Sequence, residues 1–269
     1  MDWYFPTTIE EAALLIGKDG HFPHSGGTFL LRRGFSGITG LVDLSGISMK
    51  EIREDNDHIH LGAGLTFSET AEKLKPLWQD CILAKSLSMA ASTPLRNRIS
   101  LGGSIAAFPI WSDLMGPLAA LGAELELFGN GPEIIPVSEY LNNRGAIQKK
   151  LITGISVPRK RVKSWYYRYT RVAFDYPLIN ISMLMDVREG MISDPVIFIT
   201  GTTKKTERLS YLEERLKGKS LVSVDIHIPD HIPGITFPDR KGLSSSYLSR
   251  HASTMLKRGL SEIGRESLS

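Results

Sequence analysis

Two glycine pairs carry the strongest chemical signal in this sequence. The first lies in Ser-Gly-Gly-Thr at residues 25–28, and the second lies in Ser-Leu-Gly-Gly-Ser at residues 100–104. Paired glycines let backbone N–H groups approach a ligand that larger side chains would exclude, and the neighbouring hydroxyls add further hydrogen-bond donors. Both segments could therefore bind a phosphate, although a glycine pair alone is more typical of a turn.

Two such segments together suit the diphosphate of a dinucleotide, which needs several backbone donors. The sequence has no Gly-x-Gly-x-x-Gly after a predicted strand and no Gly-x-x-x-x-Gly-Lys-Ser/Thr. Their absence disfavours a Rossmann domain and a P-loop. A phosphate site in this chain would therefore belong to another kind of fold.

The other reactive side chains give weaker signals. His227 and His231 have the i, i+4 spacing of a metal-binding pair, but Pro229 lies between them and opposes the helix that would align their rings. Cys81 is the only cysteine, so the chain can form no internal disulfide and no cysteine-ligated iron–sulfur cluster. We expect Cys81 to be a buried, inert thiol. We predict no metal site and no catalytic residue.

Composition indicates an ordinary globular protein. The chain has 269 residues, of which 42% are hydrophobic and 23% are charged, and its formal net charge is +3. No stretch gathers lysine, arginine and aromatic residues as a nucleic-acid surface would, so nucleic acid is not an expected partner. Residues 1–20 lack a basic start and a small-residue cleavage site, and no apolar run is long enough to span a membrane. We expect a cytoplasmic protein with no membrane contact.

The elements around the glycine pairs follow from hydrophobic spacing. Thr7 and Thr8, with glutamates three residues further on, predict the start of a helix through Ile16, and Thr66 with Glu69 predicts a second capped helix. Ser112 or Asp113 could cap a third. Strands are expected at residues 41–44, 59–63, 124–128, 134–137 and 151–157, with a turn at residues 129–131.

The second half of the chain has its own pattern. Arg159, Lys160 and Arg161 follow the last of these strands and suggest a domain boundary. Strands are expected at residues 165–171, 179–187 and 196–200, with a turn at Glu189 and Gly190, which predicts a small antiparallel sheet. Leucine spacing predicts a helix at residues 209–216 and a long final helix at residues 248–263.

Several of these motifs, taken in order, resemble one protein family. They are Gly26-Gly27-Thr28, the run Leu-Arg-Asn-x-x-Ser-Leu-Gly-Gly-Ser at residues 95–104, Ser112-Asp113, Leu151-Ile152-Thr153, Tyr166-Tyr167-Arg168 and Arg250-His251. This set resembles the FAD-binding (medium) subunit of the xanthine dehydrogenase and carbon-monoxide dehydrogenase family of molybdenum hydroxylases. The resemblance covers nearly the whole chain, and the joint order of the motifs is more specific than any one of them.

The resemblance implies an α+β protein. Its FAD-binding fold would be of the vanillyl-alcohol-oxidase (PCMH) type, in two subdomains at residues 1–55 and 56–160. Residues 161–269 would form a small antiparallel sheet with helices, as in the C-terminal domain of the carbon-monoxide dehydrogenase flavoprotein.

The resemblance also implies where FAD would bind. The diphosphate and ribityl contacts would come from Ser25, Gly26, Gly27, Thr28, Ser100, Leu101, Gly102, Gly103 and Ser104. Asp113 would accept a hydrogen bond from a sugar or ribityl hydroxyl, and Arg168 would lie near the flavin. From the residues alone, Asp113 could instead be only a helix cap and Arg168 a solvated strand cation.

Three positions depart from the family pattern. Phe29 replaces an acidic residue, Ser104 replaces an asparagine, and Arg168 stands where lysine is usual. The first two changes each remove a polar contact, but backbone N–H groups survive changes of side chain, so we still expect FAD to bind.

The function implied by the resemblance is electron transfer within a larger enzyme. FAD would receive electrons from a small partner subunit with two iron–sulfur clusters and pass them to an acceptor such as NAD, while a large subunit with a molybdenum cofactor would oxidise the substrate. Two alternatives stay open from the sequence: a free-standing FAD oxidoreductase, and an electron-transfer or scaffold subunit that has lost FAD.

Overall fold

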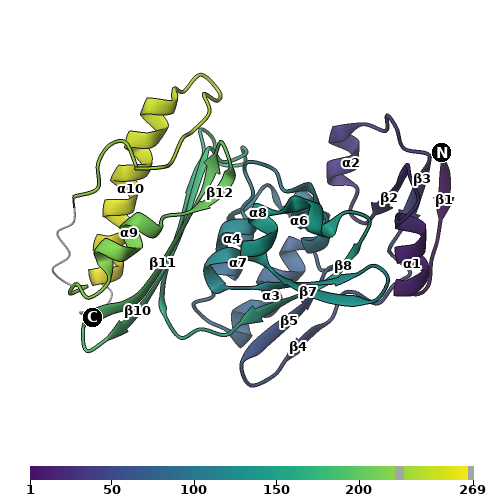
Figure 1. The fold of residues 1–269 in the computed structure, drawn as a ribbon, viewed down its shortest axis with the longest axis horizontal. Coiled ribbons are helices and arrows are strands. Elements are labelled where there is room, and N and C mark those ends of the chain that lie inside the picture. Colours follow the sequence, from purple (N-terminus) through teal and green to yellow (C-terminus); the bar gives the residue numbers. More distant parts are fainter. Residues whose placement is uncertain (222–226, 266–269) are drawn as a thin grey trace. The chain divides into compact units, whose positions relative to one another are not determined.

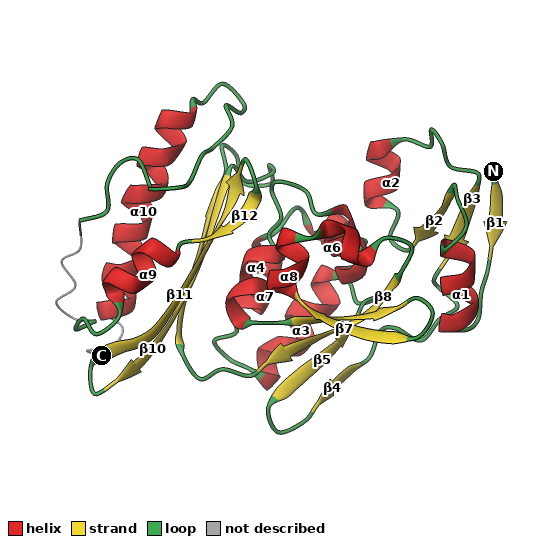
Figure 2. Cartoon of the chain, in the orientation of Figure 1, coloured by secondary structure: helices red, strands yellow, loops and turns green. Residues whose placement is uncertain are grey.

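The computed structural model describes residues 1–221 and 227–265 of the chain (Figures 1 and 2). Contacts group these residues into two compact units. The first unit contains residues 1–77, 92–108 and 122–159, and the second contains residues 78–91, 109–121 and the described residues from 160 onward. Each unit therefore draws on several stretches of the sequence, and the three domains expected from the sequence stay a prediction.

The first unit contains two sheets and the helices that follow their strands. Its elements in chain order are β1 (Asp2–Tyr4), α1 (Ile9–Ile16), β2 (His21–His24), α2 (Thr28–Arg33), β3 (Gly40–Asp43), β4 (Ile52–Glu54), β5 (His58–Gly62), α3 (Phe67–Leu77), α5 (Thr93–Arg96), α6 (Leu101–Ala107), β6 (Glu124–Phe128), β7 (Pro132–Pro136), α8 (Val137–Asn142), the 3-10 helix η1 (Arg144–Ile147) and β8 (Leu151–Pro158).

A small parallel sheet is built from the first three strands, in the order β1-β3-β2 (Figure 1). Helix α1 begins as the sequence predicts, because the Thr8 hydroxyl accepts a hydrogen bond from the N–H of Glu11 at 3.2 Å. Ala12 and Ile16 of this helix are buried with Val42 of β3. Helix α2 follows β2 directly, so the first glycine pair lies between the end of a strand and the start of a helix.

The larger sheet of the first unit has the order β4-β5-β8-β6-β7 and is antiparallel throughout. The strands predicted at residues 59–63, 124–128 and 151–157 are confirmed as β5, β6 and β8. Thr66 and Glu69 form the predicted capping box at the start of α3, with N–H to side-chain oxygen distances of 2.8 and 3.2 Å. The second hairpin strand ends earlier than expected, since Val137 begins α8 instead of ending β7.

The second glycine pair does not lie in a loop. Ser100 is the N-cap residue of α6, and Leu101, Gly102, Gly103 and Ser104 form the first part of that helix. The turn that is typical of a glycine pair is therefore not what residues 101–104 form. Glycine costs about 1 kcal/mol relative to alanine in a helix. Two adjacent glycines therefore lower the helix propensity of a seven-residue segment so far that its sequence does not predict a helix.

The second unit contains one sheet with helices on both faces. Its elements are α4 (Ile82–Met89), α7 (Met115–Leu121), β9 (Lys163–Tyr169), β10 (Ile179–Arg188), β11 (Met191–Thr202), β12 (Lys205–Arg208), α9 (Ser210–Leu216) and α10 (Ser245–Arg265).

The sheet of this unit is antiparallel, with the order β12-β11-β10-β9. It contains the three predicted strands and also the short β12, whose four residues are too few to show an alternating pattern of apolar and polar side chains. Glu189 and Gly190 form the predicted turn between β10 and β11, both with positive φ (52° and 75°). The predicted helices at residues 209–216 and 248–263 are confirmed as α9 and α10.

The two faces of this sheet are covered differently (Figure 2). On one face, alternate residues of β10 such as Ile181 and Met183 are buried in a core with Leu248 and Leu256 of α10. On the other face lies α7, all of whose residues are buried. A side chain at Gly116 of α7 would come within 2.9 Å of the Ser182 hydroxyl, so this glycine lets the helix approach the sheet closely.

Among the described residues, no helix has both the length and the apolar character that crossing a membrane requires.

Candidate functional site

The first glycine pair forms a tight turn between β2 and α2. Gly27 has φ +73°, in the left-handed region that favours glycine. A Cβ atom at Gly26 would overlap with the backbone carbonyl oxygen of Arg98, so this position must also be glycine. The guanidinium of Arg98 contacts the same turn, with Nε and Nη2 lying 3.3 and 3.2 Å from the carbonyl oxygen of Gly26.

This turn contains a row of backbone donors that have no partner in the described part of the chain. Among the hydrogen bonds of the described residues, none is donated by the backbone N–H of Ser25, Gly26 or Gly27. Successive N–H groups in a turn of this kind can form a concave site for an anion. The first segment therefore fits the diphosphate of FAD.

The second glycine pair is different because its backbone donors are already in use. The N–H groups of Leu101 and Gly102 donate to the carbonyl oxygens of Leu65 and Ala63, both at 2.9 Å. Gly103 donates to the Ser100 hydroxyl at 3.3 Å, and Ser104 donates to the Ser100 carbonyl at 3.0 Å. Residues 101–104 therefore have few backbone N–H groups left for a cofactor.

The two glycines of this second pair face different surroundings. A Cβ atom at Gly102 would lie 3.0 Å from Cβ of Ala63 and 3.2 Å from its carbonyl oxygen, so Gly102 lets α6 approach the chain after β5. A Cβ atom at Gly103 would come close only to the Ser100 hydroxyl, at 2.8 Å. Gly103 is also exposed, so the helix presents a bare patch of backbone there.

In the second unit, Asp113 and Arg168 form a buried ion pair. Arg168 Nε lies 2.9 Å from Asp113 Oδ1, and the two side chains are only 4% and 7% exposed. The Tyr166 hydroxyl donates to the same carboxylate oxygen at 2.8 Å. Arg168 Nη2 also donates to the carbonyl oxygen of Asp175 at 2.8 Å. These contacts tie the start of α7 to strand β9.

The electrostatics of this cluster are dominated by burial. Burial raises the pKa of the Asp113 carboxyl, while the neighbouring Arg168 guanidinium and Tyr166 hydroxyl act in the opposite direction. Since arginine keeps its proton in proteins, we assign Asp113 as the carboxylate partner of a charged Arg168. Burial and the Asp113 carboxylate both raise the pKa of Tyr166 well above its ordinary value, so Tyr166 stays a neutral donor.

These contacts decide two questions that the sequence left open, namely whether Asp113 caps a helix and whether Arg168 is a solvated cation. The Ser112 hydroxyl accepts hydrogen bonds from the N–H groups of Leu114 and Met115 at 3.3 and 3.2 Å, so Ser112 caps α7 and Asp113 does not. The alternative that Arg168 is a solvated cation is wrong, because its side chain is buried. Arg98 and the hydroxyl of Tyr166 were not identified from the sequence, since their partners lie 72 and 53 residues away along the chain.

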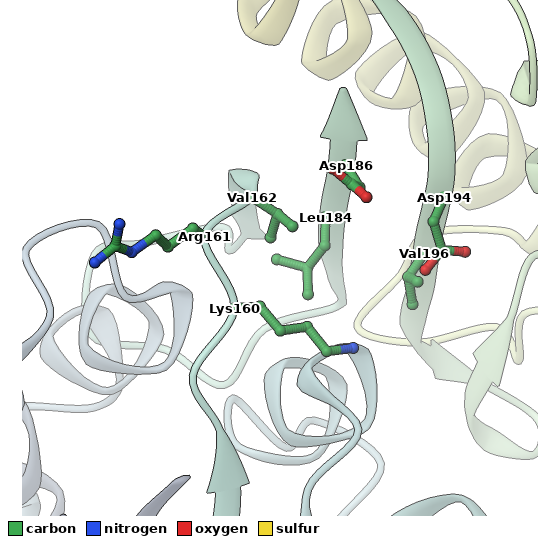
Figure 3. A pocket seen from close by; sticks show the side chains of 7 residues that line it. All are labelled: Lys160, Arg161, Val162, Leu184, Asp186, Asp194 and Val196. Carbon is green, nitrogen blue, oxygen red and sulfur yellow. The ribbon is translucent and has the colours of Figure 1, made fainter. Parts of the chain in front are cut away.

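A pocket of about 270 Å³ lies on the second unit and is shown in Figure 3. Lys160, Arg161 and Val162 border it on one side, and the lining from β10 and β11 consists of Leu184, Asp186, Asp194 and Val196. Asp186 and Asp194 are directly paired across the two strands. The lining contains none of the residues predicted to bind FAD.

A smaller pocket of about 150 Å³ lies on the larger sheet of the first unit. His60 is prominent in its lining, with Nε2 lying 3.0 Å from Asp55 Oδ2 and Nδ1 lying 3.1 Å from Glu126 Oε1. The hydrogen bond to Asp55 raises the pKa of His60, with a further contribution from Glu126, and burial opposes the rise. Both ring nitrogens of His60 therefore lie within hydrogen-bond distance of a carboxylate.

The remaining sequence candidates show no reactive site. His227 and His231 are exposed, and no group of three metal-binding side chains is found in residues 1–221 and 227–265. Cys81 is buried, and burial raises the pKa of its thiol to about 11. The expectation that Cys81 is inert agrees with both observations.

Comparison with known proteins identifies the family. Residues 1–160 match a family described as the FAD binding domain in molybdopterin dehydrogenase. Aldehyde oxidase 1 of Cavia porcellus is 24% identical in an alignment of 283 positions that covers 92% of this chain and 21% of that protein. The nicotine 6-hydroxylase medium subunit of Paenarthrobacter nicotinovorans is 25% identical over 228 residues and covers 80% of each chain.

The fold predicted by the resemblance is also confirmed. The structure of reconstituted CO dehydrogenase from Oligotropha carboxidovorans superposes with a TM-score of 0.88 at 20% identity, covering 98% of both chains. This chain spans only about a fifth of the aldehyde oxidase. The match over residues 1–160 covers more than half of the sequence, and the chain therefore belongs to the family of FAD-binding domains of molybdopterin dehydrogenases, with FAD as its cofactor.

Proposed function

We propose that this chain is the FAD-binding subunit of a multi-subunit molybdenum-containing hydroxylase. It would take electrons from iron–sulfur clusters on a small partner subunit and pass them to an acceptor such as NAD. A large partner subunit with a molybdenum cofactor would oxidise the substrate. Support comes from the family match and from a relative that is named a medium subunit. The observation that carries the proposal is the row of unengaged N–H groups at residues 25–27.

The first segment would hold the diphosphate. The backbone N–H groups of Ser25, Gly26 and Gly27 are available as donors, and the hydroxyl of Thr28 adds a side-chain donor. Backbone donors serve this purpose well because they are fixed by the turn and lose little entropy when an anion binds. This explains why replacement of the usual acidic residue by Phe29 need not abolish binding, since Phe29 follows the turn and is 42% exposed.

The second segment would contribute surface instead of backbone donors. We propose that the cofactor lies against the bare backbone at Gly103, beside the hydroxyl of Ser104. Ser100, Leu101 and Gly102 would support this surface by fixing the start of α6 against the chain after β5. The change from asparagine to Ser104 would then remove one polar side-chain contact but leave the exposed backbone at Gly103 in place.

Asp113 and Arg168 would act as a pair. Asp113 has a second carboxylate oxygen, Oδ2, that could accept a hydrogen bond from a sugar or ribityl hydroxyl while Oδ1 holds Tyr166 and Arg168. Asp113 neutralises much of the charge of Arg168. The arginine would therefore stabilise negative charge on a nearby flavin ring less than an unpaired cation would.

The chemistry itself would come from the cofactor. When bound, FAD can link one-electron donors such as iron–sulfur clusters to a two-electron acceptor. The residues of this chain would bind and orient it, and no side chain among those described is assigned as a proton donor or nucleophile. The chain therefore needs its partners for a complete reaction.

Two measurements test this proposal. The purified chain is denatured and the released flavin identified by mass spectrometry, where we expect FAD. The FAD-loaded chain is then mixed without oxygen with a reduced two-cluster iron–sulfur protein of the proposed small-subunit type, and the flavin absorption band is followed. Bleaching within seconds supports the proposed role. Release of FAD without any bleaching would indicate a free-standing oxidoreductase, and failure to bind added FAD would contradict the proposal altogether.

A further inference from the structure

We propose that Arg98 is a positioning residue for the cofactor. It orients the peptide group between Gly26 and Gly27 so that the N–H of Gly27 is available to a phosphate oxygen of FAD. This inference rests on the proposed function of the first glycine segment, and it assigns to Arg98 a role that the motif around it does not suggest.

The geometry of the contact fixes one side of this peptide group. Two nitrogens of the Arg98 guanidinium, Nε and Nη2, lie 3.3 and 3.2 Å from the carbonyl oxygen of Gly26. No peptide bond among the described residues is cis, so the N–H of Gly27 points away from that carbonyl oxygen. Holding the oxygen with the guanidinium therefore holds the N–H on the opposite side, where it donates to no acceptor within residues 1–221 and 227–265.

This peptide group needs an external restraint more than most. It lies between two glycines, which have the widest range of backbone angles, so rotation of the whole peptide is opposed by no side chain. Gly27 already has φ +73°. Without Arg98, the carbonyl oxygen of Gly26 could turn toward the place of the N–H and present a negative dipole to the phosphate.

Backbone packing brings the arginine to this position. Gly26 lies so close to the backbone of Arg98 that a Cβ atom would overlap with the Arg98 carbonyl oxygen. The same residue thus contacts the turn through its main chain and through its side chain. The Ser25 to Thr28 turn is held on the segment that leads into α6, although the two are about 70 residues apart in sequence.

The contact also strengthens the donor. A hydrogen bond from a charged guanidinium to a carbonyl oxygen polarises the amide, which makes the N–H of the same peptide group more positive. The residues of α6 cannot provide this help directly, because their N–H groups donate to Leu65, Ala63 and Ser100. Arg98, in the chain just before α6, therefore supports phosphate binding where the α6 residues themselves do not.

The test is a titration of FAD-free full chain with FAD, followed by flavin fluorescence. We expect Arg98→Ala to weaken FAD binding about tenfold, since hydrogen bonds to charged groups have effects of this size. Arg98→Lys retains one cationic donor and should recover part of the loss. Arg33→Ala is the matched control, because Arg33 also donates to backbone carbonyls of an exposed glycine turn, at Gly34 and Ser36, and its loss should leave the affinity unchanged.

Riboflavin binding distinguishes a positioning role of Arg98 from general damage to the fold of the variant. Riboflavin lacks the diphosphate, so its weaker binding should be equal in the wild type and in Arg98→Ala. The backbone amide signal of Gly27 in a ¹⁵N correlation spectrum should shift when FAD is added to the wild type and shift less in the variant. Equal FAD affinity in the two proteins, or equal loss of FAD and riboflavin, would overturn the inference. A wild-type chain that binds no FAD would instead contradict the proposed function.

Discussion

Gly26 and Gly102 each begin a Gly-Gly pair followed by a hydroxyl residue, yet their surroundings differ. The N–H of Gly26 donates to no group among the described residues, whereas the N–H of Gly102 donates to the Ala63 carbonyl at 2.9 Å. The first pair forms a turn that includes a left-handed residue, and the second lies inside a helix. Two similar motifs therefore serve two needs: one leaves donors free, and the other lets two segments approach each other.

This difference shows what a glycine pair can and cannot indicate. In the first pair Gly26 is required because backbone atoms of Arg98 occupy the space of a side chain, and in the second pair Gly102 is favoured because a side chain would crowd Ala63. That requirement exists with or without a ligand. The pairs are therefore best distinguished by whether their N–H groups have partners in the folded chain, which is a property of tertiary structure.

Gly26→Ala should have the largest effect on stability. Its Cβ would overlap with the backbone of Arg98, and backbone atoms cannot move aside as a side chain can. We expect the free energy of unfolding to fall by about 3 kcal/mol or more, measured by urea denaturation. Gly131→Ala is the control, because no atom of the described residues lies within 4 Å of a Cβ there. Equal stability of both variants would contradict the close contact.

Gly27→Ala should have the next largest effect. A residue with a side chain pays about 1–2 kcal/mol to adopt the left-handed angles of this position, and its Cβ would lie 3.1 Å from His24 Nε2. Gly27→Asn should be milder, since asparagine tolerates these angles better. Thermal melting of the two variants checks the order. If alanine were as stable as asparagine, the left-handed conformation would not be the cause.

Gly102→Ala tests the role assigned to the second pair. Alanine favours the helix over glycine by about 1 kcal/mol, but the new Cβ lies 3.0 Å from Cβ of Ala63. We expect the two effects to leave a net loss of less than about 1 kcal/mol in the free energy of unfolding. Adding Ala63→Gly should remove the contact, so the double variant should be more stable than the sum of the single changes predicts. Simple additivity would count against the contact.

Gly103→Ala should have the smallest effect on stability and the most informative effect on binding. Its gain in helix preference, about 1 kcal/mol, should be offset by displacement of the Ser100 cap. If FAD lies against this exposed backbone, its affinity should nevertheless fall about tenfold, which is about 1.4 kcal/mol. Titration with FAD and urea denaturation of the same sample measure both. Unchanged affinity would remove Gly103 from the proposed site.

Long, regular elements of this fold could be predicted from the sequence. The spacing of Leu248, Ala252 and Leu256 indicates α10, and the alternation in β9 to β11 indicates a sheet. Thr8 and Thr66 mark helix starts because a capping hydrogen bond is local in sequence. The short helices α2, α4, α5, α6 and α8 were not predicted, since segments of eight residues or fewer give little periodic signal unless a capping pair or a leucine repeat marks them, as in α1 and α9.

The candidate site was less predictable than the fold. Residue types identified the glycine pairs, and resemblance to a family connected them with FAD. The state of each N–H group could not be predicted, because the acceptors Ala63 and Leu65 lie far from α6 along the chain. The pairing of Asp113 with Arg168 spans 55 residues and has no local signature. Contacts of this kind are set by packing, which a single sequence does not reveal.

The interleaving of the two units limits how this protein can be shortened. The backbone passes from one unit to the other after residues 77, 91, 108, 121 and 159. A fragment that ended at residue 160, where the family match ends, would include α4 and α7 but lose the β9 to β12 sheet on which they pack. Every residue of α7 is buried in the intact chain, so its apolar surface would then face water and promote self-association. The cofactor site is best studied in the uncut polypeptide.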